Sequence, residues 1–305
     1  MATMRAAMID RYGAPEVLRL RQAPIPDVPV GAIRIRATAA SVNPLDWKIR
    51  DGSIQQHLPL ELPVVLGRDA AGVVEAVGEG VHDVAVGDRV FGLGTAIGAY
   101  AELVVLHAWA RTPDAWTDAE AAAMSLTGVT AARGLRELGA IDDVLVVHGA
   151  GGGVGSAAAS IAIAQGARVV GTARPADHEH LRSLGVDPIA AGPDAADAVR
   201  AAIGDADPQV LDTVGDESVD PLVALTRGGD RAVTVVSQVQ AERLGIRSAD
   251  GQNDVAALEL LARLATEADL RPRIAREYPL ADAAAAHRDA EERRLRGKAV
   301  LRIAD

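Results

Sequence analysis

The sequence contains no cysteine and very few aromatic residues. Aromatic residues make up 2 % of the 305 positions, with a single phenylalanine, Phe91, although 49 % of the residues are hydrophobic. Without cysteine the chain can form no disulfide, no catalytic thiolate and no cysteine-ligated zinc site. Its core must be built mainly from Ala, Val and Leu, which favours close packing of helices on a sheet over an aromatic-lined groove.

The chain also lacks a concentration of positive charge and a long apolar segment. Its formal net charge is −11, and an acidic protein repels nucleic acid and anionic membranes. No stretch reaches the roughly 18 consecutive apolar residues of a membrane span, and residues 1–10 contain no long apolar run. We therefore expect a soluble, cytoplasmic protein that binds neither nucleic acid nor a membrane.

Residues 1 to about 120 contain short apolar segments that are separated by glycine and proline. Such strands at short spacing predict a compact, barrel-like β domain. The predicted strands are 6–9, 32–37, 71–77 and 88–91.

From residue 118 onward, helical and strand patterns alternate. Strands that are buried on both faces and separated by helices are typical of a parallel, doubly wound sheet, so the predicted fold class is α/β. A short apolar strand at 299–303 resembles the predicted strands in the first half of the chain. We therefore predict a discontinuous first domain, residues 1–121 and 265–305, and a dinucleotide-binding domain of residues 122–264. The predicted helices are 118–124, 130–138, 156–165, 176–184 and 254–264, and the strands are 143–148, 167–171, 208–214, 231–236 and 243–246.

A glycine-rich segment, residues 148–156, lies between a predicted buried strand and a predicted helix. Glycines let the backbone turn tightly and approach a pyrophosphate, and the amides at the helix N-terminus stabilise the anion. The order of strand, turn and helix is the context that a dinucleotide-binding motif requires; the alternative is a glycine loop without a ligand. The predicted cofactor-binding residues are Ala150, which occupies the first glycine position, Gly152, Gly153, Val154 and Gly155.

The end of the second strand decides which dinucleotide binds in such a fold. An NAD site has an acidic residue there for the ribose 2′-hydroxyl, whereas this segment ends in Thr172-Ala-Arg174. The planar guanidinium of Arg174 suits a 2′-phosphate, and Thr172 can add a hydroxyl, with His178 or His180 in support. The alternative is that Arg174 is an ordinary solvated residue. We predict NADPH as the cofactor.

Nine segments of the chain match, in order, a known set of motifs: 4–8, 41–50, 66–74, 86–91, 98–102, 126–131, 148–156, 212–215 and 296–301. Together they resemble the medium-chain dehydrogenase/reductases, and in particular the quinone oxidoreductase or ζ-crystallin-like branch, over nearly the whole chain. The resemblance implies a GroES-like β-barrel domain and a Rossmann domain, with the active-site cleft between them. It also implies a homodimer.

Zinc-dependent relatives place metal ligands at positions that this resemblance identifies. The corresponding residues here are Asn43, Arg68 with Asp69, and the 125–126 region, which do not supply the cysteine and histidine ligand set. We therefore predict no metal site. Without a Lewis acid, the acceptor must carry its own activation, as quinones and enones do. The expected reaction is hydride transfer to a quinone or another electron-poor, carbonyl-conjugated acceptor.

By the same resemblance, Asn43, Asp46 and Lys48 are the candidate catalytic residues. Asn43 could donate a hydrogen bond, Asp46 could orient its neighbours or relay a proton, and Lys48 could donate to an enolate. Lys48 could equally be solvated or pair with Asp46. Thr130 corresponds to the threonine beside the nicotinamide, or is a helix-start hydroxyl. Lys298 follows a glycine before the last strand and is either near the cofactor phosphates or a surface lysine.

Two other functions stay open at this point. An enoyl or 2-alkenal reductase in a biosynthetic pathway would need the same hydride geometry. A non-catalytic, NADPH-binding structural or regulatory protein is the other alternative, because the branch includes lens crystallins and proteins that bind AU-rich RNA. The net charge opposes the RNA-binding version.

Overall fold

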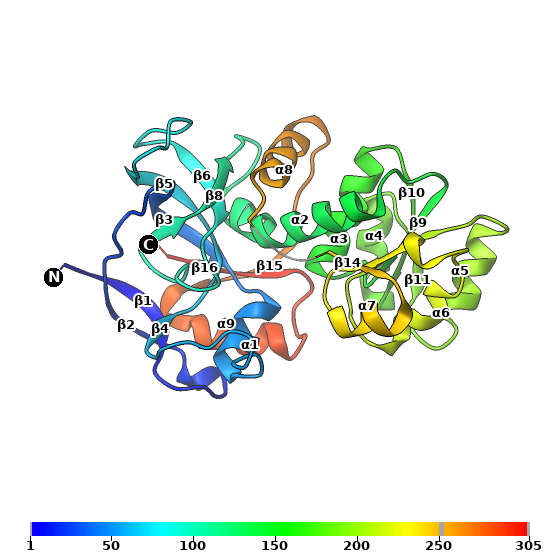
Figure 1. Ribbon diagram of the computed structural model, residues 1–305, viewed down its shortest axis with the longest axis horizontal. Coiled ribbons are helices and arrows are strands. Elements are labelled where there is room, and N and C mark those ends of the chain that lie inside the picture. The colour runs from blue at the N-terminus through cyan, green and yellow to red at the C-terminus, as the bar shows by residue number, and fades with distance from the viewer. Residues whose placement is uncertain (1, 250–252, 304–305) are drawn as a thin grey trace. The chain divides into compact units, whose positions relative to one another are not determined.

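A computed structural model describes residues 2–249 and 253–303 of the chain. The described residues form two compact units, which Figure 1 shows as a ribbon. The first, called the β unit, comprises Met1–Leu126, Asn253–Thr266 and Arg271–Asp305. The second, called the α/β unit, comprises Thr127–Gln252 and Glu267–Leu270.

The chain returns to the β unit at Asn253, earlier than the predicted boundary at residue 265. The side chain of Asn253 bonds to Arg68 and to the carbonyl oxygen of Gly94, both in the β unit. Helix α8, Val255–Glu267, therefore begins in the β unit, whereas we had assigned its segment to the dinucleotide-binding domain.

Two sheets make up the β unit. Strands β2, β1 and β4 form a three-stranded antiparallel sheet, and a second sheet has the order β15-β16-β3-β5-β6-β8, with β7 also paired to β3. Buried residues alternate with more exposed ones along the first part of β3, as expected for a strand with one face in the core. The bounds are β1 Thr3–Ile9, β2 Arg19–Pro24, β3 Ile33–Ser41, β4 Val64–Val65, β5 Asp69–Val77, β6 Arg89–Leu93, β7 Leu103–Leu106, β8 Ala108–Arg111, β15 Ile274–Pro279 and β16 Lys298–Arg302.

The C-terminal strand β16 lies between β3 and β15. It pairs antiparallel with the end of β3, with Val300 opposite Ser41, and parallel with β15. The N–H of Val42 extends this ladder by donating to the carbonyl of Ala299 at 3.0 Å. This pairing brings Lys298, the first residue of β16, next to the segment that follows β3. Helix α9, Ala283–Glu291, precedes β16 and packs against it.

Helix α1, Pro44–Asp51, starts directly after β3 with a capping box. Asn43 is the N-cap residue, Pro44 occupies the first helical position, and the Asp46 carboxylate accepts a hydrogen bond from the Asn43 N–H at 2.8 Å. These are the residue types that satisfy the unpaired amides of a helix start. The helix ends at Gly52, whose left-handed φ of 84° suits glycine.

A six-stranded parallel sheet forms the α/β unit. Its order, β11-β10-β9-β12-β13-β14, reverses between β9 and β12, which is the Rossmann arrangement, and ligands of such sheets bind at the carboxyl ends of the strands near this point. All five residues of β9 are buried, as its continuous apolar sequence predicts. The strands are β9 Val144–His148, β10 Arg168–Ala173, β11 Asp187–Ala190, β12 Gln209–Asp212, β13 Ala232–Thr234 and β14 Arg247–Ser248, and the helices are α3 Gly153–Ala164, α4 His178–Ser183, α5 Ala195–Ile203, α6 Asp220–Val223 and α7 Gln238–Leu244.

Three predicted elements differ from the structure. The predicted helices 118–124 and 130–138 are one continuous helix, α2, Asp118–Leu138, which starts in the β unit and ends in the α/β unit. The predicted strand 243–246 was wrong, because α7 covers the start of that segment. Ser237 caps α7 by accepting a hydrogen bond from the Gln240 N–H, and Gly245 ends it with a left-handed φ of 64°.

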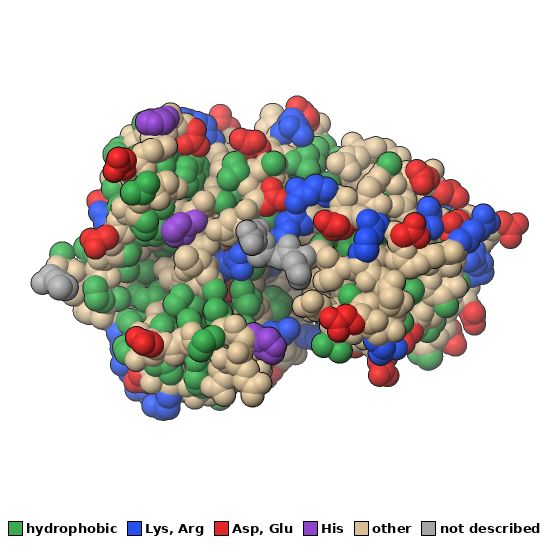
Figure 2. All heavy atoms as spheres, viewed as in Figure 1, with side chains coloured by type: hydrophobic (Ala, Val, Ile, Leu, Met, Phe, Trp, Pro, Cys, Tyr) green, Lys and Arg blue, Asp and Glu red, His purple; other side chains and the backbone are tan. Residues whose placement is uncertain are grey.

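The surface and the helices give two further observations. No helix among the described residues is both long and apolar enough to cross a membrane. On the face of the α/β unit that Figure 2 shows, acidic and basic side chains are interspersed rather than gathered by sign.

Candidate functional site

The glycine-rich segment connects β9 to α3 at the carboxyl edge of the parallel sheet. Gly149 has a left-handed φ of 82°, which lets the chain turn directly after β9. A Cβ atom on Gly155 would lie 2.3 Å from the carbonyl oxygen of Gly149, so glycine is required for α3 to pack this closely on the turn. Ala150 is fully buried, and its N–H donates to the carbonyl of Thr172, which ties the turn to β10.

The N-terminus of α3 has no side-chain cap among the described residues, and its N-cap position is Gly152. Helix geometry leaves the first-turn amides, including those of Gly153 and Val154, without an intrahelical acceptor, and they form the positive end of the helix dipole. The first turn also contains no acidic side chain. The predicted loop residues therefore lie together in an arrangement that fits a bound pyrophosphate.

Thr172 contacts the glycine loop from β10 and is fully buried. Its hydroxyl is 2.8 Å from Nδ1 of His148 and accepts a hydrogen bond from the Gly149 N–H at 3.3 Å. The other ring nitrogen of His148 lies 2.9 Å from the Ser218 hydroxyl, and burial lowers the pKa of the imidazole. We correct the predicted role accordingly: Thr172 supports the loop from below rather than adding a hydroxyl to a 2′-phosphate.

Arg174 directly follows β10 and reaches the surface. Its side chain is 52 % exposed, and its Nε lies 3.2 Å from the buried carboxylate of Asp177. Asp177 packs beside the glycine loop, since a Cβ atom on Gly151 would come within 3.1 Å of its carboxylate oxygen. Arg174 is therefore held at the same edge of the sheet as the loop. His178 turns back instead, with Nε2 3.2 Å from the carbonyl of Ala173.

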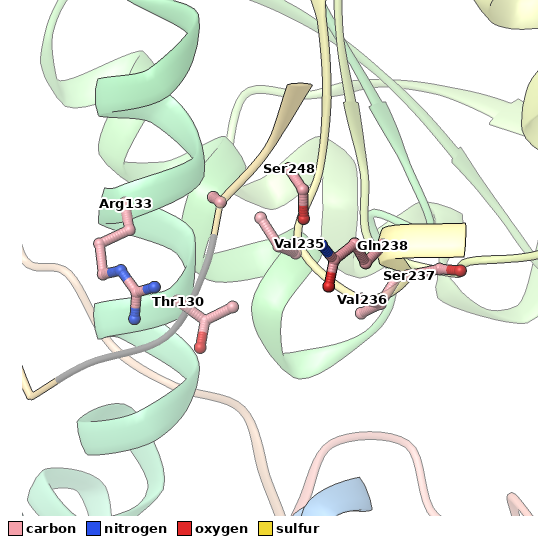
Figure 3. A pocket seen from close by; sticks show the side chains of 8 residues that line it. Thr130, Arg133, Val235, Val236, Ser237, Gln238 and Ser248 are labelled. Atoms are coloured by element: carbon pink, nitrogen blue, oxygen red, sulfur yellow. The ribbon is translucent and has the colours of Figure 1, made fainter. Parts of the chain in front are cut away.

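A pocket of about 190 Å³ lies beside α2 in the α/β unit (Figure 3). Thr130 points from α2 toward the segment after β13, which forms the opposite wall, and Arg133 lies one turn further along α2. Arg133 is buried, so a cation lines this pocket. The role of Thr130 beside a nicotinamide stays a prediction. The lining residues are Thr130, Arg133, Val235, Val236, Ser237, Gln238, Ser248 and Ala249.

The β unit contains a second group of functional side chains, which we call the buried polar cluster. It lies where β3, α1, β5, α9 and β16 meet, and each member is less than 9 % exposed. One member, Tyr100, also belongs to the hydrophobic core of the β unit. The cluster comprises Ser41, Asn43, Asp46, Arg50, Asp69, Tyr100, His287 and Lys298.

Asn43 connects a cation to a carboxylate inside this cluster. Its carbonyl oxygen accepts a hydrogen bond from the Lys298 ammonium, and its amide nitrogen donates to Asp69 at 3.0 Å and to the Ser41 carbonyl at 3.2 Å. Both amide hydrogens are therefore used within the protein. We correct the prediction that Asn43 donates a hydrogen bond to the acceptor: its side chain positions Lys298 and Asp69.

Lys298 is 7 % exposed and is therefore no surface lysine. Its ammonium also donates to the carbonyl of Val42 at 2.8 Å, and burial lowers its pKa while Asp69 opposes this shift. The predicted contact of Lys298 with the cofactor phosphates is not tested by these bonds and stays a prediction.

Asp69 accepts hydrogen bonds on both carboxylate oxygens. The donors are the Ser41 N–H and hydroxyl, the Asn43 amide, and the Leu126 N–H at 3.3 Å. Burial raises the pKa of Asp69, and the positive charge of Lys298 opposes this rise. Because every one of these partners is a donor, the bonding pattern fits the ionised form of Asp69.

Asp46 has one oxygen in use and one without a partner. Its Oδ2 accepts hydrogen bonds from the Asn43 N–H and from the Tyr100 hydroxyl at 2.8 Å, whereas Oδ1 is shielded from solvent and has no hydrogen-bond partner. Burial and the neighbouring Asp69 raise the pKa of Asp46 to about 7. The vacant Oδ1 is the position where a proton can reside without displacing a bond.

A chain of buried groups connects Asp46 to an exposed carboxylate. Tyr100 donates to Asp46 and lies 3.2 Å from His287 Nε2, while Nδ1 of His287 lies 3.3 Å from the Arg50 guanidinium. Arg50 bonds to Glu291 at 2.9 Å. Because Arg50 can only donate, Nδ1 must accept and Nε2 must carry the hydrogen. Burial and Arg50 lower the pKa of His287 to about 3, so this histidine is neutral.

Lys48 lies outside the cluster. It is exposed on α1, two residues from Asp46, and side chains at this spacing on a helix point in different directions. The alternative that Lys48 pairs with Asp46 is therefore wrong, because Asp46 is fully buried. Lys48 is therefore solvated in the structure, and its catalytic role stays a prediction.

Four residues of interest were not predicted. Tyr100 and His287 join Asp46, Arg133 lines the pocket, and Arg68 carries a buried Nε. Arg133 could have been noticed one helical turn after Thr130. The sequence gives no local indication that Tyr100 and His287 meet, since 187 residues separate them. Arg68 was identified only as a residue at a metal-ligand position of zinc-dependent relatives.

Two family models match the chain: an alcohol dehydrogenase GroES-like domain over residues 30–114 and a zinc-binding dehydrogenase over residues 184–301. Polyketide synthase GfsB of Streptomyces halstedii is 34 % identical over 90 % of this chain, which spans only 5 % of that protein. The human quinone oxidoreductase is 39 % identical over 56 % of this chain and 53 % of its own length. The mouse quinone oxidoreductase is 29 % identical over 94 % of this chain and 93 % of its own.

Three solved structures with the same fold are quinone oxidoreductases or contain NADPH. The quinone oxidoreductase of Coxiella burnetii is 28 % identical with a TM-score of 0.87, and the alignment covers 99 % of this chain and 100 % of that one. A mycobacterial quinone oxidoreductase is 30 % identical with a TM-score of 0.81, and a mycobacterial protein in complex with NADPH is 29 % identical with the same score. Both alignments cover 98 % of this chain and 100 % of the other.

Proposed function

The chain belongs to the medium-chain dehydrogenase/reductase superfamily as a quinone oxidoreductase-like protein, and from this premise we propose that it is a zinc-independent, NADPH-dependent oxidoreductase. Its acceptor is a quinone or another electron-poor compound with a conjugated carbonyl group. The bound cofactor supplies the hydride.

The position of Arg174 is the observation that supports NADPH most strongly. It follows β10 directly, is half exposed, and is held beside the glycine loop through Asp177. A guanidinium at this strand end offers paired donors to a 2′-phosphate, and NAD sites carry an acidic side chain there. One related structure contains NADPH. The uncapped amides at the start of α3 would hold the pyrophosphate.

The residues present do not fit a catalytic zinc ion. Asn43 and Asp69 are committed to each other and to Lys298, and Arg68 is a cation. No group of three metal-ligating side chains occurs among the described residues. We therefore derive no step through a metal, although one matching family model describes zinc-binding dehydrogenases.

Asp46 is the proposed proton source. When hydride adds to a quinone or enone, the π electrons move onto the carbonyl oxygen, and the product needs one proton. A carboxyl group with a pKa of about 7 and a vacant Oδ1 can hold that proton and release it near neutral pH. Tyr100 and His287 hold the other oxygen of Asp46 in place.

Oxidation of NADPH with a panel of quinones and enones tests the proposal. We expect turnover with NADPH, weaker turnover with NADH, and no change with a chelator. Arg174→Asp should lower the preference for NADPH on the order of 10- to 100-fold, because it removes charge-assisted hydrogen bonds. Arg227→Asp, an equal charge change at another exposed site, is the control. Equal use of both cofactors by the unaltered protein would contradict the role of Arg174.

A reductase of C=C bonds in a biosynthetic pathway is the second candidate. It is favoured by the alignment of 90 % of the chain with a segment of a polyketide synthase. Product analysis separates the two: a saturated carbonyl compound supports C=C reduction, and a hydroquinone or semiquinone supports quinone reduction. Tight NADPH binding with no turnover of any acceptor would support the non-catalytic alternative.

A homodimer and a cytoplasmic location remain part of the proposal. Strand β14 forms an edge of the six-stranded sheet, where a second copy could pair with it. Light scattering of the purified protein, which yields the mass in solution, tests the dimer.

A further inference from the structure

Arg68 contains a buried donor that the fold does not use. Its Nη2 donates to the Asn253 side chain at 3.2 Å, but its Nε is shielded from solvent and has no hydrogen-bond partner. A buried donor without a partner costs about 1–3 kcal/mol, and more when it is charged. Such a group needs a physical explanation, and a catalytic role is one of those known for native proteins.

The Arg68 side chain is also fixed in place. Asn253, which accepts from Nη2, donates in turn to the Gly94 carbonyl at 3.2 Å, and the Arg68 carbonyl accepts from the Gly94 N–H at 2.9 Å. Backbone and side chain are therefore anchored to the same residue. A rigid, planar guanidinium loses little entropy when it binds an oxygen, and it stays charged at any working pH.

Arg68 makes no direct ion pair with its neighbour Asp69. The carboxylate oxygens of Asp69 are occupied by Ser41, Asn43 and the Leu126 N–H, and no ion pair involving Arg68 occurs among the described residues. Burial lowers the pKa of Arg68, while Asp69 and Asp46 oppose this shift, so these three groups share one electrostatic environment. A cation with an open donor thus lies in the region of the proton-bearing Asp46.

We propose that Arg68 is a catalytic residue whose Nε–H binds the carbonyl oxygen of the acceptor and stabilises the negative charge that develops there. This inference rests on the proposed function and specifies its substrate class: acceptors whose oxygen becomes an enolate or phenolate. The bound nicotinamide cofactor would give up one C–H bond as hydride and be oxidised, and a new C–H bond would form at the acceptor carbon. The π electrons of the acceptor move onto its oxygen, and Asp46 Oδ1 delivers the proton. Arg68 keeps all of its protons and supplies the electrostatic stabilisation.

Binding of 4-nitrophenol tests this role without turnover, because the phenolate and phenol forms differ in absorbance. We expect the protein to bind the phenolate form preferentially and Arg68→Met to lose this preference at least 10-fold. Arg36→Met, a change at an exposed arginine of β3, should leave it intact. The rate of acceptor reduction should fall on the order of 10²- to 10³-fold in Arg68→Met, as for loss of one oxyanion donor.

Further variants separate a catalytic role from a structural one. Asn253→Ala removes the anchor but keeps the guanidinium, so it should lose less activity than Arg68→Met. Added methylguanidinium should partly restore Arg68→Gly, and thermal unfolding would verify that the variants fold. If Asn253→Ala matches Arg68→Met and methylguanidinium restores nothing, Arg68 only orders the segment and the inference is overturned.

The outcomes also distinguish this inference from the proposed function. Normal quinone reduction by Arg68→Met would refute the inference and leave the function intact. Arg68-dependent phenolate binding in a protein that reduces no acceptor would support the site and refute the function.

Discussion

The two units of this protein build their candidate sites in opposite ways. The α/β unit uses the backbone. Its glycines leave room for a tight turn, and the amides at the start of α3 are free of side-chain caps among the described residues. The β unit uses side chains, and its buried polar cluster draws them from five helices and strands and from two further residues, Asn43 and Tyr100. A backbone site tolerates many side chains but few changes of glycine. A buried side-chain network depends on each partner, because every lost partner leaves a polar group unsatisfied.

The largest expected effect comes from Asp46→Asn, which removes the carboxyl group that is the proposed proton source and keeps the shape of the side chain. The rate of acceptor reduction should fall roughly 10²- to 10⁴-fold, the usual contribution of a general acid. In the unaltered protein the rate should decrease as pH rises through about 7, the pKa of Asp46. The pH–rate profile measures both, and a variant that keeps this pH dependence would show that another group supplies the proton.

Lys298→Met tests whether the Lys298 ammonium compensates the buried Asp69 carboxylate within the cluster. The ammonium is buried against Asn43 and offsets Asp69, so its loss leaves a buried carboxylate without a compensating cation. We expect a loss of about 3–5 kcal/mol in the free energy of unfolding. Denaturant unfolding measures this loss. Lys48→Met, at the exposed lysine of α1, should change stability by less than about 0.5 kcal/mol.

A pair of glycine variants tests the backbone site. Gly155→Ala places a Cβ 2.3 Å from a backbone oxygen, so it should destabilise the α/β unit by about 1–3 kcal/mol. Gly152→Ala meets only the Gly149 oxygen at 3.4 Å, so it should retain stability but weaken NADPH binding. Thermal unfolding with and without NADPH separates the two effects. Equal cofactor affinity in Gly152→Ala and the unaltered protein would argue against a pyrophosphate at this turn.

The smallest expected effect concerns stability as a function of pH. The folded pKa of Asp46 is raised to about 7, so its contribution to stability is present at low pH and is lost as pH rises through 7. The folded pKa of His287 is lowered to about 3, so its contribution is present above its usual pKa of 6.5 and is lost as pH falls. Between roughly pH 4 and 6.5 these two slopes oppose each other.

Two variants expose these opposing slopes. Asp46→Asn leaves the histidine contribution, so its stability should decrease as pH falls from 6.5 to 4, by up to about 1.4 kcal/mol per pH unit. His287→Gln leaves the aspartate contribution, so its stability should increase over the same range. Urea unfolding at several pH values measures both. Slopes of the same sign in the two variants would mean that the assigned protonation states are wrong.

The contrast between the backbone site of the α/β unit and the side-chain network of the β unit also explains how much was predictable from the sequence. The parallel sheet and the glycine loop that follows β9 were predicted because each depends on a local pattern, such as the continuous apolar sequence of β9. The role of Arg174 stays a prediction. The side-chain partners of Asn43 were not predicted, because Asp69 and Lys298 come from distant parts of the chain. The catalytic role of Lys48 stays a prediction. The position of Lys298 follows from the pairing of β16 with β3, a contact across more than 250 residues that sequence periodicity cannot encode.

The most direct test of this account is the protonation state of Asp46 in the folded protein. Infrared difference spectra between the unaltered protein and Asp46→Asn would reveal the carbonyl stretch of a protonated carboxyl group. We predict that this band is present at pH 6 and disappears with a midpoint near pH 7. A difference spectrum that shows only an ionised carboxylate at pH 6 would contradict the proposed proton source.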